Sequence, residues 1–360
     1  MLNPFTDPLE SGANPLALAK FINHLSARRA GPLGMKPWAF SPQELTSMME
    51  ESHLHYRPFT LPKKAGGSRK IHAPKPALKM VQWALAPFFR TLFTPAACSF
   101  GFERGRGIVE NARVHVGQDW VLNADIRDFF PSISTARLQG LFLSDWGPRM
   151  SVYMAQCFAR LVTHQGRLPQ GAPSSPVLTN LVAADLDIRL QGLALHFGCR
   201  YSRYVDDITF SSSGQNALHE VMPRLFRIVA SEGFELNPEK TRLQSASMRQ
   251  GVTGLVLTSA KSDVAPCVSV PREFRRHTRS MLYAWRANGL IEVSRRSGQT
   301  PQEFARSAEG RIAHICHVRQ SPEAKRFHAE LARLLQRDAG ALDGSAGPLD
   351  ESAGPSGLAV

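Results

Sequence analysis

Three aspartates stand where short apolar segments of this chain end. Asp206 and Asp207 are neighbours in the run 204–207, and Asp125 follows the apolar residues 120–124. Phosphoryl transfer with two divalent ions needs carboxylates from separate strands that converge on ions roughly 3.5–4 Å apart. The residue types and their placement therefore predict a two-metal site of the kind that polymerases use.

The segments that must position these aspartates include several extended runs. Residues 120–124 predict a buried strand that delivers Asp125. The runs 199–205 and 208–212 predict a hairpin that carries the other two aspartates at its tip. A further strand is predicted at 234–236. The three carboxylates are thus expected to meet at one edge of a sheet.

Helical patterns lie between these strands. Ser134 can cap a helix over 135–143. A longer helix is predicted over 175–190, with Pro176 at its tolerated first position and apolar residues at helical spacing. Another helix is expected near 223–230. Strands and helices that alternate in this way predict an α+β fold.

The N-terminal part combines helices with a hairpin. Helices are expected over 15–25 and 41–52. Two extended runs surround a Gly-Gly turn in residues 56–74, which predicts a hairpin. The helical segment 78–85 follows and is expected to end at Pro87 or shortly after, because proline interrupts the hydrogen bonds of a helix.

Charge is plentiful and unevenly distributed. The 360 residues carry 43 Lys and Arg against 30 Asp and Glu, a formal net charge of +13. Residues 57–102 contain eight basic residues and no acidic one, and the helical segment 271–337 contains fourteen basic residues and six acidic ones. Because basic surfaces neutralise phosphates and release their counterions, a nucleic acid is the expected partner.

Composition also indicates the setting of the protein. Residues 338–360 are rich in Gly, Ala, Ser and Pro and are expected to be a disordered tail. Five scattered cysteines without a Cys-x-x-Cys predict neither a disulfide framework nor a zinc ribbon. The chain shows no signal peptide and no apolar stretch long enough to span a bilayer. We expect a soluble cytoplasmic protein without a membrane partner.

Three sequence blocks in fixed order resemble those of reverse transcriptases of the bacterial retron type. They are D-x-x-x-F-F at 125–130, Q-G-x-x-x-S-P at 170–176 and Y-x-D-D at 204–207. The resemblance extends from about Arg57 to about Thr258 and is looser in the C-terminal helices. It implies an RNA-directed DNA polymerase.

The resemblance also implies a right-hand polymerase fold. It predicts an N-terminal helical segment at 1–55, fingers and palm built from an antiparallel sheet and helices at 56–265, a basic helical thumb at 266–337, and the tail at 338–360.

Roles for individual residues follow from the same resemblance. Asp125 and Asp206 would hold two Mg²⁺ ions with Asp207 assisting, since hard cations prefer oxygen ligands. Lys240 matches a palm lysine proposed to protonate the pyrophosphate leaving group. Phe130 occupies the position whose bulky side chain excludes a 2′-hydroxyl, which favours dNTPs.

Further residues would contact the incoming nucleotide. Gln170 can hydrogen-bond it, and Gly171 permits a close approach of the backbone. Lys63, Lys64 and Arg69 resemble the fingers residues that grip the triphosphate.

Two short elements narrow the resemblance to retrons. Asn111 and His115 belong to an N-A-x-x-H element, and residues Val252, Thr253 and Gly254 form a V-T-G element. By resemblance, these elements help to recognise a cognate structured noncoding RNA. The enzyme would prime on this RNA and copy part of it into a short DNA that stays linked to RNA. The family's usual role is anti-phage defence with a separate effector protein.

Simpler interpretations accompany several of these residues. Asp128 is expected to face solvent or cap a turn. The glycines of 101–107 are expected to form a flexible loop near the nucleic acid, and the His and Cys residues of 314–317 are interpreted as packing residues. Asn111 and His115 could simply cap and pack a helix, and Lys240 could be a solvated lysine.

Two alternative functions remain open from the sequence. One is a reverse transcriptase of the group II intron or abortive-infection kind. The other is a non-catalytic RNA-binding scaffold on a polymerase fold. The intact Asp125, Asp206 and Asp207 argue against the scaffold, because clustered carboxylates are unfavourable unless a cation neutralises them.

Overall fold

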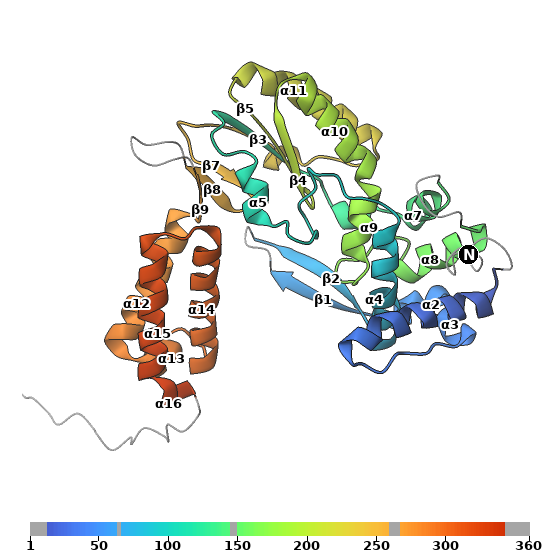
Figure 1. Ribbon diagram of the computed structural model, residues 1–360, viewed down its shortest axis with the longest axis horizontal. Helices are drawn as coiled ribbons and strands as arrows, with labels where there is room; N and C mark the ends of the chain where they lie inside the picture. Colours follow the sequence, from blue (N-terminus) through green and yellow to red (C-terminus); the bar gives the residue numbers. More distant parts are fainter. Residues whose placement is uncertain (1–12, 63–65, 145–149, 259–266, 343–360) are drawn as a thin grey trace, which may run out of the picture. The chain divides into compact units, whose positions relative to one another are not determined.

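The computed structural model describes residues 13–62, 66–144, 150–258 and 267–342 (Figure 1). The chain divides into two compact units, Met1–Thr253 and Gly254–Val360. The first unit contains the whole expected fingers region and nearly all of the expected palm. Its border lies twelve residues before the predicted start of the thumb at 266.

The N-terminal helices pack on the core of the first unit. They are α2 (Pro15–Ala30) and α3 (Pro42–Glu50), which contact α4 (Pro76–Thr91) and α8 (Val152–Val162) respectively. A capping box begins α3, since Ser41 accepts a hydrogen bond from Glu44 N and the Glu44 side chain bonds back. These helices therefore close one side of the hydrophobic core.

The predicted hairpin is present as β1 (Tyr56–Pro62) and β2 (Ser68–Pro74), paired antiparallel. Lys63 and Lys64, expected to grip the triphosphate, lie outside the described residues. The following helix α4 contains Pro87 and ends at Thr91, whereas the sequence predicted an end at Pro87 or shortly after. Phe88 and Phe89 are buried just beyond this proline, and their packing offsets the single hydrogen bond that proline removes.

A four-stranded antiparallel sheet carries the three aspartates. Its order is β4 (Arg200–Tyr204), β5 (Asp207–Ser212), β3 (Trp120–Asp125) and β6 (Arg242–Ser245). Helices α10 (Ala184–His196) and α11 (Gln215–Ser231) pack against it, as contacts of α10 with β4 and of α11 with β3 and β5 show (Figure 1). The predicted α+β palm architecture is confirmed.

Smaller elements connect these parts. They are α5 (Ile108–Arg113), α6 (Phe129–Ser132), α7 (Thr135–Phe142), α9 (Ser175–Val182), a 3-10 turn at Pro238–Lys240 and β7 (Gln250–Val252). Ser134 caps α7 by accepting a hydrogen bond from Arg137 N, as the sequence predicted. The aromatic rings of Phe89, Phe142 and Phe158 pack together in the core.

Three predicted boundaries were wrong. The single helix expected over 175–190 is two helices, α9 and α10, because Ala183 leaves the helical region with φ −90° and ψ 6°. The helix expected near 223–230 begins at Gln215 and contains Pro223. Residues 234–236 contribute only an isolated bridge between Ile126 and Leu236 instead of a strand.

The second unit is mainly helical. It contains the antiparallel pair β8 (Leu255–Thr258) and β9 (Cys267–Ser269), followed by α12 (Arg272–Asn288), α13 (Leu290–Arg296), α14 (Pro301–Val318), α15 (Pro322–Arg337) and α16 (Ala339–Leu342). Trp285 and Phe304 are buried at its centre. The expected helical thumb is therefore present.

Helical structure in this unit continues past the predicted start of the tail at 338. Asp338 Oδ2 accepts hydrogen bonds from Trp285 Nε1 at 2.7 Å and from Leu290 N at 3.1 Å. The short helix α16 follows directly. The expectation of disorder is thus wrong for 338–342, and residues 343–360 lie outside the described part of the chain.

Candidate active site

The three aspartates meet at one end of the palm sheet. Asp125 is the last residue of β3, and it pairs across the sheet with Asp207, the first residue of β5. The backbone N–H of Ile126 donates a hydrogen bond to the Asp206 carbonyl at 2.9 Å. The predicted hairpin tip therefore forms and brings the separate strands together.

The site concentrates negative charge in partial burial. Loss of solvent raises the pKa of Asp206, and the nearby Asp125 carboxylate raises it further. Burial, followed by the charges of Asp206 and Asp125, raises the pKa of Asp207 to about 7. Such a cluster is stabilised by a bound cation, which compensates the repulsion between like charges.

Basic side chains reach the aspartates from two elements. Lys240, at the end of the 3-10 turn, places its Nζ 2.7 Å from Asp125 Oδ1. The charge of Lys240 partly offsets the rise in the pKa of Asp206 and of Asp207. The charge of Arg69 on β2 partly offsets the rise in the pKa of Asp206. Arg69 and Lys240 therefore both lie close enough to affect the aspartates electrostatically, and their predicted roles toward the nucleotide stay predictions.

The chemistry of the carboxylates fits Mg²⁺, but their present arrangement is not a ligand set. No group of three His, Cys, Asp or Glu side chains in the described part of the chain is arranged to hold a metal ion as it stands. Asp125 instead binds the Lys240 ammonium group. This ion pair occupies Oδ1 of the Asp125 carboxylate.

Val205, between the paired strands, has an unusual backbone conformation. Its φ is 61°, in the left-handed region that β-branched residues rarely adopt. Its carbonyl accepts a hydrogen bond from Arg203 Nη1 at 3.0 Å. A Cβ added to the buried Gly101 would lie 2.6 Å from Val205 N, so only glycine fits there. Gly101 thus belongs to a packed contact, and the predicted flexible loop is wrong at this residue.

A buried polar network holds this turn, and sequence reasoning missed it. Arg203 has no exposed surface. Its Nε lies 2.8 Å from Asp187 Oδ1 and its Nη2 lies 2.7 Å from Asp187 Oδ2. Tyr201 donates to Asp187 Oδ1 at 2.8 Å. Burial alone would lower the pKa of Arg203, but the Asp187 carboxylate raises it above its ordinary value, so the guanidinium stays charged.

Asn180 on α9 extends the network to the Gly101 segment. Its Oδ1 accepts hydrogen bonds from both terminal nitrogens of Arg203 at 3.3 Å, and its Nδ2 donates to the Gly101 carbonyl at 2.8 Å. One set of buried hydrogen bonds therefore links α9, α10, β4 and the Gly101 segment to Val205 and Asp206, the turn between β4 and β5 that we call the aspartate turn. The only sequence signal was an Arg within the Tyr201–Tyr204 strand, which alone predicts a solvated side chain.

The residues expected to contact the nucleotide, Phe130, Gln170 and Gly171, all contact other parts of the protein. Phe130 is half-buried, and its ring lies edge-on to Phe102 with a centroid separation of 6.3 Å. The Gln170 carbonyl accepts a hydrogen bond from His72 N at 3.0 Å. Gly171 has φ 112°, and an added Cβ would lie 2.9 Å from Ile71 Cγ2. Gly171 therefore lies close against β2, and its predicted contact with the nucleotide stays a prediction.

Asn111 and His115 are fully buried, with no exposed surface. His115 bridges two strands, because its Nδ1 lies 2.7 Å from Ser211 Oγ and its Nε2 lies 2.7 Å from Ser202 Oγ. Neither side chain is accessible for a direct contact with RNA in this structure, and their role in RNA recognition stays a prediction. The simpler expectation that both residues pack a helix agrees with their burial.

The pKa of His115 provides a test of this packing. Burial, with a smaller effect from Arg200, lowers the pKa of His115 to about 3. Below about pH 6.5 the unfolded chain binds a proton that the folded chain does not, so His115 destabilises the fold by up to about 1.4 kcal/mol per pH unit down to about pH 3. We expect the melting temperature of His115→Gln to fall less than that of the wild type between about pH 7.5 and about pH 5.

The difference between the two proteins isolates this histidine, since every other titrating group is shared. Parallel curves of melting temperature against pH would show that His115 does not control the proton uptake.

The second retron-like element lies beside the first. Val252 is buried, and Thr253 Oγ1 lies 3.3 Å from the Ile108 carbonyl on α5. Thr253 is half-buried and has φ 47°, and Gly254 is exposed with φ 80°. Two elements far apart in the sequence therefore meet through α5 and β7. Arg113 of the first element and the turn after β7 are accessible.

Other expectations concern residues outside the aspartate cluster. Asp128 is exposed, as predicted, with φ 44°. The His314 ring packs edge-on against Phe274, and Cys316 contacts the Ala324 carbonyl, which agrees with packing roles. A search of the described residues found no helix both long enough and apolar enough to cross a membrane.

Comparisons with known proteins agree with the geometry of the site. The family model described as "Reverse transcriptase (RNA-dependent DNA polymerase)" matches residues 61–275, which include all three aspartates. The chain is 34% identical to the retron Mx162 reverse transcriptase of Myxococcus xanthus over 79% of this chain and 62% of that protein. It is 37% identical to the retron Mx65 reverse transcriptase of the same organism over 67% of this chain and 58% of that protein.

A third relative is matched over more of its length. The retron Ec86 reverse transcriptase of Escherichia coli is 33% identical over 74% of this chain and 83% of that protein. The alignments with the two Myxococcus proteins thus span about three fifths of those relatives.

Proposed function

Because the chain belongs to the reverse transcriptase family, we propose that it is an RNA-directed DNA polymerase of the retron type. The observation that carries this proposal is the meeting of Asp125, Asp206 and Asp207 at one end of the palm sheet, within the matched domain. Identities of 33–37% to three retron reverse transcriptases support the subfamily.

In this proposal Asp125 and Asp206 would hold two Mg²⁺ ions and Asp207 would assist. The ions would supply charge neutralisation at the reacting phosphate and activation of the primer hydroxyl. Lys240, whose Nζ lies 2.7 Å from Asp125 Oδ1 and whose side chain is 59% exposed, would donate a proton to the pyrophosphate leaving group. Arg69, with Lys63 and Lys64, neutralises the triphosphate, and Gln170 and Gly171 border the nucleotide.

Phe130 is proposed to select the sugar. Its half-buried ring, supported by Phe102 and Phe129, presents a fixed surface five residues after Asp125. Replacing Phe130 with Ala should raise incorporation of rNTPs relative to dNTPs by about tenfold or more, because the steric barrier to a 2′-hydroxyl is removed. Single-nucleotide incorporation on one primed template measures the ratio. An unchanged ratio in a folded variant would remove Phe130 from this role.

The variant Gly101→Ala tests whether the reaction takes place at the aspartate turn. Gly101→Ala places a methyl group against Val205 N, where an added Cβ would lie at 2.6 Å, so the turn must shift. A misplacement of about 1 Å can lower the rate about 10²-fold. We expect a loss of this order in dNTP incorporation on a primed template.

Gly192→Ala in α10 is the matched control, because an added Cβ there meets nothing within 4 Å. Full activity of Gly101→Ala would show that the position of the Val205 turn does not matter for the chemistry.

The template is proposed to be a cognate structured noncoding RNA. The enzyme primes on this RNA and copies part of it into a short single-stranded DNA that remains linked to RNA. The packing of the N-A-x-x-H segment against β7 supports a shared surface near the accessible Thr253 and Gly254. The enzyme is further proposed to act in anti-phage defence together with a separate effector protein.

The proposal is tested by expressing the gene with its flanking DNA and isolating nucleic acids from the cells. We expect a short DNA whose gel mobility changes after ribonuclease treatment, and none with the Asp206→Asn variant. A protein that extends annealed primers but makes no RNA-linked DNA would fit the intron or abortive-infection type. One that binds RNA without incorporating nucleotides would fit a scaffold.

A further inference from the structure

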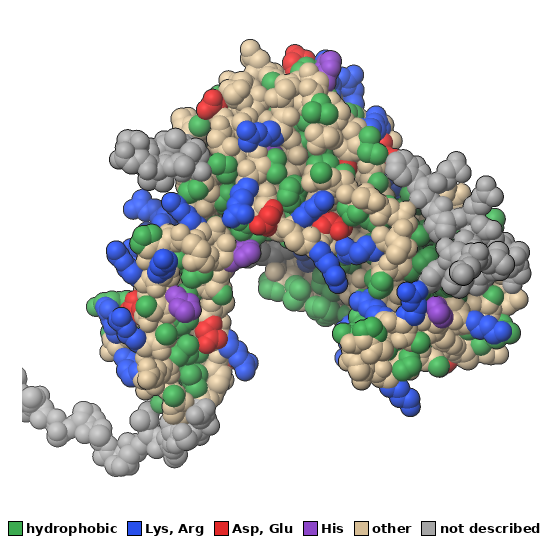
Figure 2. All heavy atoms as spheres, in the orientation of Figure 1, with side chains coloured by type: hydrophobic (Ala, Val, Ile, Leu, Met, Phe, Trp, Pro, Cys, Tyr) green, Lys and Arg blue, Asp and Glu red, His purple; other side chains and the backbone are tan. Residues whose placement is uncertain are grey.

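The β1–β2 hairpin carries Arg69, whose charge reaches Asp206, yet most of the hairpin is exposed. The residues of β1 after Tyr56 are exposed, and so are the first three residues of β2. Hydrophobic side chains are visible over this hairpin (Figure 2), and Phe59 and Leu61 are among the exposed ones. A strand pair with so few buried side chains takes its orientation from the contacts at its base.

Three rings from two separate segments meet at this base. The centroid of the His164 ring lies 4.4 Å from that of Tyr56 and 4.9 Å from that of His72. Tyr56 begins β1, His72 lies near the end of β2, and His164 follows α8 in the chain. Tyr56 and His164 are buried, and His72 is half-buried. The ring of His164 therefore packs against both strands of the hairpin.

The segment that carries His164 leads to Gln170 and Gly171. His164 and Arg167 exchange backbone hydrogen bonds at 2.8 and 3.1 Å, which form a tight turn. Further along the segment, the Gln170 carbonyl accepts a hydrogen bond from His72 N at 3.0 Å, and Gly171 lies close against β2. The hairpin and this segment are thus joined twice, by the rings at His164 and by the backbone at Gln170.

The His164 contact depends on the ring more than on its nitrogens. Nδ1 of His164 is buried and has no hydrogen-bond partner among the described residues, which is unfavourable for a polar atom. Burial, followed by the charge of His72, lowers the pKa of His164. Burial, followed by the charge of Lys70, lowers the pKa of His72, so both rings are neutral at about pH 7.5. Neutral rings in contact attract each other through dispersion and ring packing.

We infer that His164 is a positioning residue for the incoming nucleotide, because its ring, packed against Tyr56 and His72, fixes the hairpin that carries Arg69. The inference rests on the proposed function for the contact between Arg69 and the triphosphate. Arg69 lies five residues before the end of β2, so a tilt at the base moves it away from the aspartates. The aspartates belong to a different sheet, so loss of the ring should weaken nucleotide binding more than it slows the chemical step.

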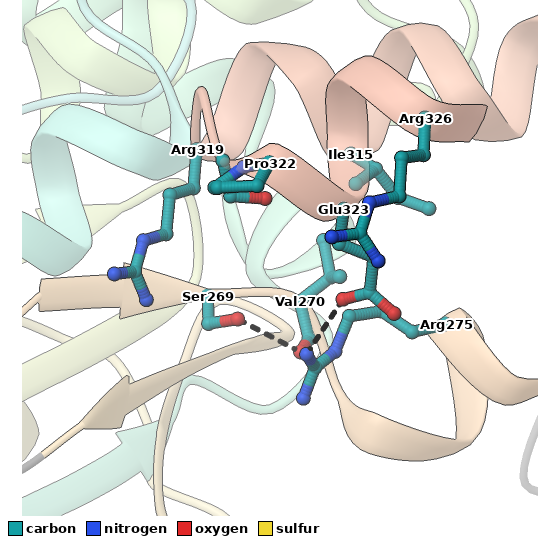
Figure 3. A pocket seen from close by; sticks show the side chains of 9 residues that line it. Ser269, Val270, Arg275, Ile315, Arg319, Pro322, Glu323 and Arg326 are labelled. Carbon is teal, nitrogen blue, oxygen red and sulfur yellow. Dashed lines mark hydrogen bonds and ion pairs between the residues drawn. The ribbon is translucent and has the colours of Figure 1, made fainter. Parts of the chain in front are cut away.

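The first measurement is hydrogen exchange of the full-length protein without nucleic acid or dNTPs. His164→Ala should speed exchange in peptides that cover residues 68–74, because the hydrogen bond from His72 N opens more often. Peptides of the palm strands at 200–212 should exchange as in the wild type. The peptide with Arg319 and Glu323 (Figure 3) is the internal reference, since it belongs to the C-terminal unit.

The second measurement is single-turnover incorporation of one dNTP on a primed RNA template over a range of dNTP concentrations. His164→Ala should raise the apparent dissociation constant of the dNTP roughly tenfold and lower the rate at saturating dNTP by less than about twofold. His164→Phe keeps a ring without the buried nitrogen, so it should restore wild-type values in both measurements.

His196→Ala is the matched control. The His196 ring also packs on a neighbouring aromatic ring, that of Phe197 at 4.7 Å between centroids, but it lies at the end of α10. This variant should match the wild type in both measurements. His72→Ala removes the half-buried ring of the same contact and should reproduce both effects of His164→Ala, which separates them from a folding defect at the buried position.

Three results would overturn the inference. The first is wild-type exchange at 68–74 in both His164→Ala and His72→Ala. The second is a fall in the rate at saturating dNTP with an unchanged dissociation constant. The third is a failure of His164→Phe to restore the wild-type values, which would assign the role to the ring nitrogens. Because exchange is measured without substrates, a wild type that does not polymerise would contradict the proposed function and leave the exchange result intact.

Discussion

Asp206→Asn should abolish DNA synthesis on a primed RNA template, with a loss of at least about 10³-fold in the rate of dNTP incorporation. Removing one charged oxygen ligand takes away several kcal/mol of transition-state stabilisation, and each 1.36 kcal/mol corresponds to about tenfold in rate. Asn keeps the size of the side chain, so the turn between β4 and β5 should persist. Incorporation of a single labelled dNTP in the presence of Mg²⁺ measures the effect.

Asp128→Asn provides the matched control. Asp128 lies three residues past Asp125 but is exposed, and Asn tolerates its left-handed backbone with φ 44°. This variant should retain nearly full activity, and both variants should bind RNA as the wild type does. Mg²⁺-dependent synthesis that survives in Asp206→Asn would contradict the assignment of the aspartate cluster.

Asp187→Ala should cause the largest loss of stability among these substitutions. It leaves the Arg203 guanidinium, which has no exposed surface, without its carboxylate partner. Breaking a buried ion pair in this way costs about 3–5 kcal/mol, because the remaining charge stays desolvated. We expect a clear fall in the melting temperature of the first unit, measured by circular dichroism.

A double variant separates stability from the position of the aspartates. Asp187→Leu/Arg203→Met replaces both charges with apolar groups and should recover most of the stability, since buried ion pairs often exchange for apolar residues at little cost. It also removes the hydrogen bond from Arg203 to the Val205 carbonyl. DNA synthesis should therefore remain low although the protein is folded. Recovery of both properties would show that the network serves stability alone.

Local patterns in the sequence predicted much of the site. The apolar runs that precede Asp125 and Asp206 predicted strands, and the structure brings their ends together. The capping residues Ser41 and Ser134 correctly marked the starts of two helices. The strands depend on the alternation of side chains along a short run, and the helix caps depend on hydrogen bonds between residues three positions apart. A short stretch of sequence is therefore enough to predict both.

Some element boundaries required knowledge of the surrounding packing. Pro87 and Pro223 each lie inside a helix, although the sequence predicted a helix end near Pro87 and a helix start near Pro223. Buried neighbours such as Phe89 and Leu225 keep the helix axis continuous past each proline. Their burial against other elements outweighs the local loss of one hydrogen bond.

The amino-acid sequence by itself determined the identity of the three aspartates, the hairpin that carries two of them, and the basic character of the helical unit. Only the tertiary structure decided that Arg203 is an internal residue paired with Asp187, that Gly101 must lack a side chain because Val205 lies against it, and that His115 is neutral and buried. Each of these depends on contacts between segments distant in the sequence. Burial turns an arginine or a histidine from a solvated surface group into a fixed part of the core, and no local pattern of residue types records that burial.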